Sequence, residues 1–277
     1  MSSLSNHTNN MHLTDQELLP IDIDEATNFL IERSKKLVDT FVKQRGHKEP
    51  PFPATELAKL NGIKTIEKAD LGETSAILNK DPDGYTIKVN RRNSPVRQNF
   101  SCAHEIGHTF LHELELNHPL HTDQDEFRTG KQTKGSYRER LCDIAAAELL
   151  MPEDIFRKYL VNSGISVSSI EKLANTFMVS AQAIAIRIAK VSPKPCDAII
   201  WKPLRKTRSC GFIGYYAQKL IYIRNPSPLL KAYDTDNPCT SYKSFENGNI
   251  KRRCLMESKG FGRGETRYVI SLIFAEK

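Results

Sequence analysis

The spacing of hydrophobic residues changes along this chain from helical to strand-like. Over residues 24–44, apolar side chains recur every three or four positions, which predicts an amphipathic helix with one buried face: Ala26, Phe29, Leu30, Leu37 and Phe41. A proline-rich break and a short helix follow. Helical spacing resumes near Pro95 and again over residues 136–151. Two further short helices are expected after it, the first with a capping box formed by Ser168 and Glu171.

Strand signals occur in two places. The segments TSAILNK (74–80) and GYTIKVN (84–90), joined around DPDG, predict a β-hairpin. The second of these strands is either an edge that could hold an extended peptide or simply part of the sheet beneath a helix. Strand-like runs return over residues 211–225 and 266–275, after a proline-containing linker.

These patterns predict an α+β protein, in which a mainly helical domain with a small β-sheet precedes a smaller β-rich or α+β C-terminal domain. Residues 1–20 are polar and predict a disordered tail. We expect the main domain to span residues 21–190, including a C-terminal helical pair. Residues 191–195 are then a linker, and residues 196–277 form a basic accessory domain.

Composition and charge narrow the class of protein. A hydrophobic content of 39% and a charged content of 26% are typical of globular proteins. No apolar run reaches the ~20 residues that span a bilayer, and the start resembles no secretion signal, so we expect a cytoplasmic protein without a membrane partner. The net charge of +7 is uneven, because residues 190–277 hold 17 Lys and Arg against 7 Asp and Glu. The accessory domain is therefore expected to attract acidic protein surface or nucleic acid, unless this charge is only a solvated face.

Six cysteines in a chain without an export signal are expected to be reduced thiols. Cys102 and Cys142 flank the motif described next and are conceivable metal ligands, although small buried hydrophobes are the more common role. The four C-terminal cysteines have spacings that match no zinc motif.

The strongest chemical signal is the sequence HEIGH at residues 104–108. On a helix, His104 and His108 project from one face one turn apart, so that both imidazoles can reach one Zn²⁺ at about 2.0–2.1 Å. Glu105 lies beside them and could accept a proton from water. An amphipathic helix whose histidines bind nothing is the alternative to this metal site.

A third ligand is needed, and His112 is a poor candidate. The helix rises about 12 Å from His104 to His112, which is too far for both rings to bind one ion. We expect His112 to support a ligand or to pack. Glu139 and Asp143, at i and i+4 of an apolar helix, suit the site better: Glu139 as ligand and Asp143 as acceptor of a histidine N–H. His118 and His121 are weaker alternatives.

Two blocks of sequence, RQNFSCAHEIGHTFLH (97–112) and ERLCDIAAAELLMP (139–152), resemble the ImmA/IrrE family of metallopeptidases. The resemblance extends over residues 20–190. It implies that His104, His108 and Glu139 bind the metal.

The resemblance further implies that Glu105 is the catalytic glutamate of a gluzincin-like zinc endopeptidase with a zincin-like fold. The substrate that it implies is a helix-turn-helix transcriptional repressor, cut in a stress or mobile-element response. The chain departs from the family pattern at Cys142, Asp143 and Ala145, and none of these positions is an implied ligand.

The residues favour metal-assisted hydrolysis, with Zn²⁺ (Mn²⁺ is the alternative ion) activating water and Glu105 as general base. Tyr137, Arg138, His112 and Tyr159 are equal candidates for the group that stabilises the oxyanion. The rival functions are a DNA-binding regulator and a metal sensor without peptidase activity. The helical pair over residues 170–190 has helix-turn-helix proportions, but the start of its second helix offers no Arg or Lys to DNA.

Overall fold

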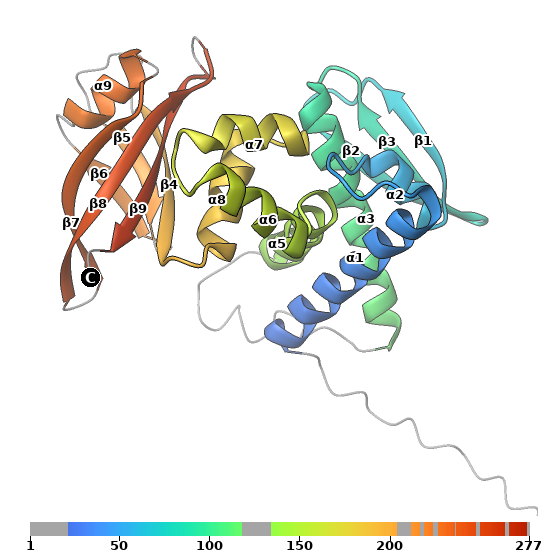
Figure 1. Cartoon of the computed structure of the whole chain (residues 1–277). Coiled ribbons are helices and arrows are strands. Elements are labelled where there is room, and N and C mark those ends of the chain that lie inside the picture. The colour runs from blue at the N-terminus through green and yellow to red at the C-terminus, as the bar shows by residue number, and fades with distance from the viewer. Residues whose placement is uncertain are drawn as a thin grey trace, which may run out of the picture.

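A computed structural model describes residues 22–117, 134–203, 212–216, 219–223, 227–235, 237–247, 250–263 and 266–275. Helices occupy the middle of the molecule, with a three-stranded sheet at one end and a six-stranded sheet at the other (Figure 1). The predicted α+β class is confirmed. The predicted disordered tail, and the loop that holds His118 and His121, lie outside the described residues.

Helix α1 (Ile23–Arg45) has the predicted amphipathic character. Asp22 caps its first turn, because the carboxylate accepts a hydrogen bond from the Glu25 N–H at 2.8 Å, and Gly46 ends it with φ +66°. The buried face consists of Ala26, Leu30, Ser34, Leu37, Val38 and Phe41. This face packs on α5, the helix that holds Glu139.

The small sheet has the order β1-β3-β2. Helix α2 (Ala54–Leu60) leads into β1 (Ile63–Ala69), which pairs in parallel with β3 (Gly84–Asn90). The predicted hairpin is confirmed, since β2 (Ala76–Asp81) pairs antiparallel with β3. The interpretation of residues 84–90 as a sheet edge is wrong, because β3 is the central strand and both of its sides are paired.

Helices α3 (Pro95–Asn117) and α5 (Lys134–Leu150) pack against each other over their apolar faces, and both were predicted. Helix α6 (Glu153–Ser163) follows directly after Pro152, and α7 (Ser169–Phe177) and α8 (Ala181–Val191) form the predicted helical pair.

The predicted capping box at the start of α7 is wrong. Ser168 makes no side-chain hydrogen bond to the helix, and Glu171 pairs instead with Lys259 of β8 at 2.9 Å. The serine that does cap is Ser180, which accepts a hydrogen bond from the Ala183 N–H at 3.1 Å at the start of α8.

The C-terminal sheet has the order β6-β5-β4-β9-β8-β7, and its described strands pair antiparallel throughout. Its elements are β4 (Cys196–Pro203), β5 (Phe212–Tyr216), β6 (Lys219–Ile223), α9 (Ser227–Thr235), β7 (Cys239–Asn247), β8 (Ile250–Phe261) and β9 (Tyr268–Ala275). Helix α9 covers one face (Figure 1), where Trp201 is fully buried and donates a hydrogen bond to Ser271 at 2.8 Å. The opposite face meets α8, and Phe261, Ile270 and Leu272 join the same hydrophobic core as the helices.

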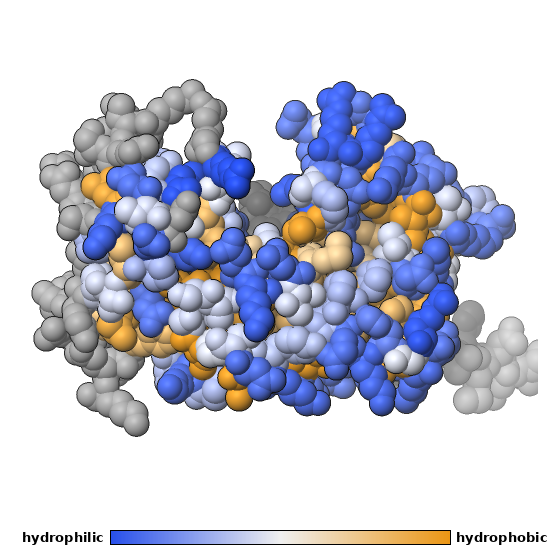
Figure 2. All heavy atoms as spheres, turned by 45° about the horizontal axis from the view of Figure 1, so that its top comes forward, coloured by the Kyte–Doolittle hydropathy of each residue, from blue (hydrophilic) through white to orange (hydrophobic). Residues whose placement is uncertain are grey.

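The change from helices to this sheet falls between Val191 and Cys196. The division into a main domain, a linker and an accessory domain stays a prediction. Figure 2 shows that the surface is hollowed between the two ends of the molecule, with hydrophobic residues at the base of the hollow and hydrophilic residues on both sides. Within the described residues, no helix has both the length and the apolar character needed to cross a bilayer.

Helix α8 is fixed to the end of α5 by a buried ion pair. The Arg187 guanidinium donates to Glu148 Oε1 at 2.7 Å and to the Met151 carbonyl oxygen at 2.7 and 3.1 Å. The side chains of Arg187 and Glu148 are only 2% and 1% exposed. Removing one partner of such a pair leaves the other charge buried and uncompensated.

We therefore expect Arg187→Met to lower the free energy of unfolding by about 3–5 kcal/mol, measured by urea titration. The double variant Arg187→Met with Glu148→Gln removes both charges and should lose less stability than the single variant. Equal losses in the two variants would contradict the assignment of this cost to the stranded carboxylate.

Candidate metal centre

The HExxH residues lie on the face of α3 that meets α5. The rings of His104 and His108 are 5.0 Å apart between centroids and nearly perpendicular, at 73°. Their side chains are 15% and 23% exposed, so each ring is largely enclosed while one edge remains accessible. The four-residue spacing on a helix produces this pairing directly.

Helix α5 brings two carboxylates to the same rings. Glu139 Oε2 lies 3.0 Å from His104 Nε2, and Glu139 Oε1 lies 3.7 Å from His108 Nε2. Asp143 Oδ1 lies 2.9 Å from the other ring nitrogen of His104, Nδ1. The structure thus brings together four of the residues singled out in the sequence, and two helices supply them.

These distances suit a metal ion. Two ligand atoms on a tetrahedral ion with bonds of ~2.0–2.1 Å lie about 3.3 Å apart, close to the separations between Glu139 and the two histidines. If Asp143 accepts the Nδ1–H of His104, then Nε2 carries a lone pair that faces a second acceptor, Glu139, at 3.0 Å. Such an approach requires a proton or a cation between the two atoms. The donor set of two imidazoles and a carboxylate therefore fits Zn²⁺.

The charges of the site act on the two histidines in opposite directions. Burial lowers the pKa of His104, but the hydrogen bond and charge of Asp143, with the charges of Glu105 and Glu139, outweigh it and raise this pKa overall. The pKa of His108 is lowered, mainly by burial and secondly by the positive charge of the nearby His104. His108 is thereby kept in the neutral form that binds metals.

Glu105 lies next to the histidines but faces a different neighbour, the strand β2. It is 8% exposed, and burial raises the pKa of its carboxyl group above the usual range. The charge of His104 and a backbone hydrogen bond from Leu78 partly offset this effect. An enclosed carboxylate with a raised pKa is chemically suited to accept a proton and to release it again. The contact with Leu78 could not be found from the sequence, because it depends on how the hairpin meets α3.

A further donor atom is close to the histidines. The sulfur of Cys142 and one nitrogen of each of His104 and His108 lie within 4.8 Å of one another. Cys142 is fully buried, and burial raises the pKa of its thiol above the ordinary range. Because a metal ligand must be the thiolate, this burial makes Cys142 a weaker ligand than the half-exposed carboxylate of Glu139. Cys102 is also buried, which raises its thiol pKa to about 12.

His112 lies away from this donor set. Its Nδ1 is 3.2 Å from the hydroxyl oxygen of Tyr85, and the two rings stack with centroids 5.8 Å apart. Tyr85 comes from β3 and was not singled out in the sequence. Its place beside α3 follows from the packing of the small sheet, which no local pattern reveals.

Of the other candidates for oxyanion stabilisation, two hydroxyl groups have different partners. Tyr137 donates to the carbonyl oxygen of Ile23 at 3.3 Å, and Tyr159 bonds Glu49. Arg138 is paired with Glu115, and its positive charge still acts on both His108 and His112. His112 is likewise engaged by Tyr85, so these contacts leave all four as candidates.

The two helices meet at a point where a side chain is absent. A Cβ atom on Gly107 would lie 2.9 Å from the Cα of Cys142, 3.1 Å from its carbonyl oxygen and 3.2 Å from the Cβ of Ala145. Only glycine lets the backbone of α3 approach α5 this closely. Glu139 and Asp143 lie on either side of this contact, so the close approach brings both carboxylates within reach of the histidines.

Comparison with known proteins agrees with this description. Residues 58–189 match the profile of the IrrE N-terminal-like domain. The radiation response metalloprotease IrrE of Deinococcus radiodurans is 30% identical over 129 residues, which cover 46% of this chain and 38% of that protein. Its counterpart in Deinococcus deserti is 31% identical over 137 residues, which cover 49% and 46%. The chain thus spans less than half of the length of either relative.

A solved structure supports the fold beyond this domain. The structure of a Mycobacterium tuberculosis transcriptional regulator superposes with a TM-score of 0.59 at 14% identity, over 91% of this chain and 93% of that one. The helices and the C-terminal sheet therefore occur together in another protein.

The match over residues 58–189 defines a domain of the IrrE N-terminal type, and it includes every residue of the candidate metal centre. Over this domain the chain is similar to the ImmA/IrrE family, and the resemblance noted in the sequence is confirmed.

The contact at Gly107 leads to a prediction. Gly107→Ala should lower the free energy of unfolding by about 1–3 kcal/mol, because backbone atoms of Cys142 cannot move aside as a flexible side chain could. It should also loosen the α3–α5 contact and speed the reaction of the buried Cys142 with a thiol reagent, followed by mass spectrometry.

The matched control is Gly46→Ala, which strains a positive φ but has nothing within 4 Å of the added atom. It should destabilise the protein without exposing Cys142. If Cys142 reacts at the same rate in both variants, Gly107 does not set the distance between the helices.

Proposed function

We propose that this protein is a zinc-dependent metallo-endopeptidase. The observation that carries the proposal is the convergence of His104, His108 and Glu139 beside an enclosed Glu105, with atom separations that suit one metal ion. The match to the IrrE N-terminal-like domain and the metalloprotease names of the two relatives support it.

The proposed ligands are His104, His108 and Glu139, with Mn²⁺ as the alternative ion. Two histidines and a glutamate leave a coordination position open, which is typical of catalytic rather than structural zinc sites. When bound, Zn²⁺ supplies a Lewis acid that polarises a peptide carbonyl and acidifies water near neutral pH. Asp143 orients the ring of His104 through Nδ1, and His112 supports the site from one turn further along α3.

The proposed chemical step is a proton transfer by Glu105. Its carboxylate accepts a proton from the water that attacks the scissile carbonyl, and it then delivers that proton to the leaving amine. Its burial keeps bulk water from competing for the proton, and its raised pKa brings it closer to the proton affinity that both transfers need.

The proposed substrate is an intracellular protein, a helix-turn-helix transcriptional repressor, and cleavage would release a stress or mobile-element response in the cytoplasm. This part follows from the resemblance to the ImmA/IrrE family alone. The name "radiation response metalloprotease" of the two relatives supports a role in a stress response.

A DNA-binding or metal-sensing regulator without peptidase activity is the second candidate. The transcriptional regulator that shares the fold gives it some support. Against DNA binding by the helical pair, α8 buries Ile184, Ala185, Arg187, Ile188 and Val191 against other elements. A recognition helix must instead present polar side chains to a groove.

Residues 196–277 are proposed to be an accessory region that recruits or regulates. The sheet shares a hydrophobic core with α8, and we propose that it also stabilises the helices for this reason. Both roles are compatible, because one face of the sheet is buried against α8, while the residues of the candidate metal centre come from α3 and α5.

The ligand assignment is tested by zinc analysis of purified variants. His104→Ala and Glu139→Ala should lose stoichiometric zinc, whereas His112→Ala should keep it because His112 packs on Tyr85. Cys142→Ala is the matched comparison to Glu139→Ala, since both side chains lie beside the histidines. Zinc retained in Glu139→Ala and lost in Cys142→Ala would replace the carboxylate by the thiolate in the ligand set.

The role of Glu105 is tested by Glu105→Gln. This variant should bind zinc as the wild type does and should lose cleavage about 10²–10⁴-fold, because the amide cannot accept the proton. Cleavage is measured by mass spectrometry on a panel of purified helix-turn-helix repressors. A wild-type protein that is fully loaded with zinc and cuts none of them would favour the metal-sensing regulator.

A further inference from the structure

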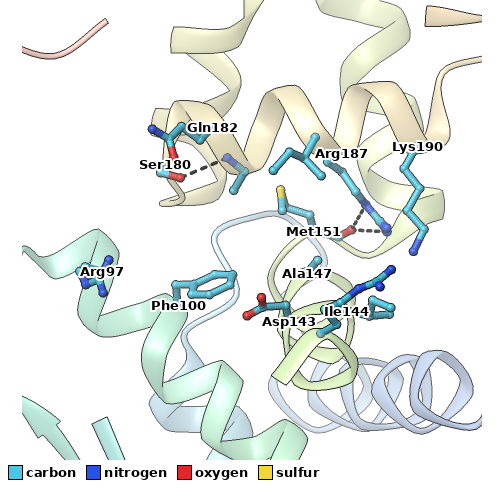
Figure 3. Close-up of a pocket in the computed structure, with 13 residues that line it drawn as sticks. Arg97, Phe100, Asp143, Ile144, Ala147, Met151, Ser180, Gln182, Arg187 and Lys190 are labelled. Carbon is cyan, nitrogen blue, oxygen red and sulfur yellow. Dashed lines mark hydrogen bonds between the residues drawn. The ribbon is translucent and has the colours of Figure 1, made fainter. Parts of the chain in front are cut away.

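A cavity of about 460 Å³ lies between α3, α5 and α8, on the side of the histidines away from the small sheet. Each of the three helices contributes to its wall. Phe100 approaches from α3, Asp143 and Ile144 from α5, and Lys190 from α8 (Figure 3). Its volume is in the range of sites that accept a small ligand or one to two side chains.

The cavity adjoins the candidate metal centre directly. Asp143 lines the cavity and also holds His104 Nδ1 at 2.9 Å. Phe100, one helical turn before His104, has its ring 6.5 Å from the ring of that histidine. His104, Glu105, His108 and Glu139 do not line the cavity themselves, so its occupant would lie beside the candidate metal centre, with Phe100 and Asp143 between them.

Much of the lining of the cavity is apolar. It includes Phe100, Ile144, Ala147, Met151 and Ile186. Ile186 is 56% exposed, although it belongs to a helix whose other large aliphatic residues are buried. An exposed isoleucine in a concave wall gains free energy when an apolar group covers it.

The lining also holds basic side chains. They include Arg97, Arg140 and Lys190, and within the part of the chain that the structure describes no carboxylate forms an ion pair with any of them. Among the described residues, the Arg97 guanidinium donates hydrogen bonds to the hydroxyl of Ser75, at 2.7 and 3.0 Å. The single carboxylate in the lining, Asp143, is engaged by His104. These basic side chains would therefore attract a negatively charged occupant. The carboxylate of Asp143 would repel it only weakly, because His104 already engages that carboxylate.

We propose that this cavity is the specificity site of the enzyme, and that it binds a substrate segment in which an apolar side chain is flanked by Asp or Glu. The apolar side chain enters between Phe100 and Ile186, and the flanking carboxylates face Arg97, Arg140 and Lys190. This rests on the proposed peptidase function, since it places the segment next to the scissile bond. A nucleic acid fits less well, because Phe100 is the only aromatic residue in the lining and base stacking needs such platforms.

Binding is tested apart from cleavage, with the zinc-loaded Glu105→Gln full-length protein. The probes are three short blocked peptides that share one central leucine and differ only in its neighbours, which are glutamate, glutamine or lysine. Isoleucine methyl NMR reports on Ile144 and Ile186 in the cavity wall. The glutamate peptide should shift both methyl signals and bind about fivefold to tenfold more tightly than the lysine peptide at low ionic strength.

Two variants locate the effect, each with a control. Arg140→Glu should remove the preference for glutamate, whereas Lys172→Glu changes the net charge equally on an exposed face of α7 outside the cavity and should leave it intact. Ile186→Ala should weaken all three peptides, whereas Val161→Ala, at a position that is 70% exposed on α6, should not. All four positions are on helix surfaces, and Ile186 is 56% exposed. The variants are therefore expected to fold.

The proposal is overturned if no peptide shifts the Ile144 and Ile186 signals at millimolar concentration, or if the lysine peptide binds as tightly as the glutamate peptide. It is also overturned if a single-stranded oligonucleotide shifts these signals in an Arg140-dependent manner and the peptides do not. Failure of the proposed peptidase function would give a different result. In that case the wild type cleaves nothing, while the glutamate peptide still binds to the cavity.

Discussion

The close contact between α3 and α5 at Gly107 is the constraint on which the candidate metal centre depends. Neither helix holds a complete set of metal ligands, since the histidines lie on α3 and the carboxylates on α5. A ligand bond tolerates little change in length, so the distance between the two helix axes must be set within a fraction of an ångström. Gly107 sets this distance, because it has no side chain and its backbone lies directly against the backbone of Cys142. Such a contact is stiffer than one between flexible side chains.

The remaining elements hold these two helices in place from outside. Helix α1 packs on α5, the small sheet packs on α3, and Arg187 ties α8 to the end of α5. Arg33 adds a further link, because it pairs with Glu113 at 2.9 Å and lies over the ring of Phe110 on α3. The site is thus supported by rigid helices and by buried contacts on several sides, which is the arrangement that keeps reactive groups in a fixed geometry.

Local patterns in the sequence were enough to predict α1, α3, α5 and the hairpin, because helical and strand-like spacing depends only on nearby residues. The spacing of His104 to His108 and of Glu139 to Asp143 also indicated which side chains share a face. Strand β1 was not predicted, since a single buried residue, Ile63, gives no alternation. The capping box failed because Glu171 is drawn to Lys259, far away in sequence. The cavity could not be predicted, because it depends on the position of α8.

The shared core of α8 and the C-terminal sheet has an evolutionary consequence. One face of α8 packs on β4 and β9, where Ile188 and Val191 belong to the same core as Ile270 and Leu272, and an adjacent part of α8 forms the wall that contains Ile186. A change of side-chain volume on the inner face of the sheet must be matched on α8, or the wall moves. Sheet and helix are therefore expected to co-vary among homologues, so that the C-terminal region diverges together with the shape of the cavity rather than independently of it.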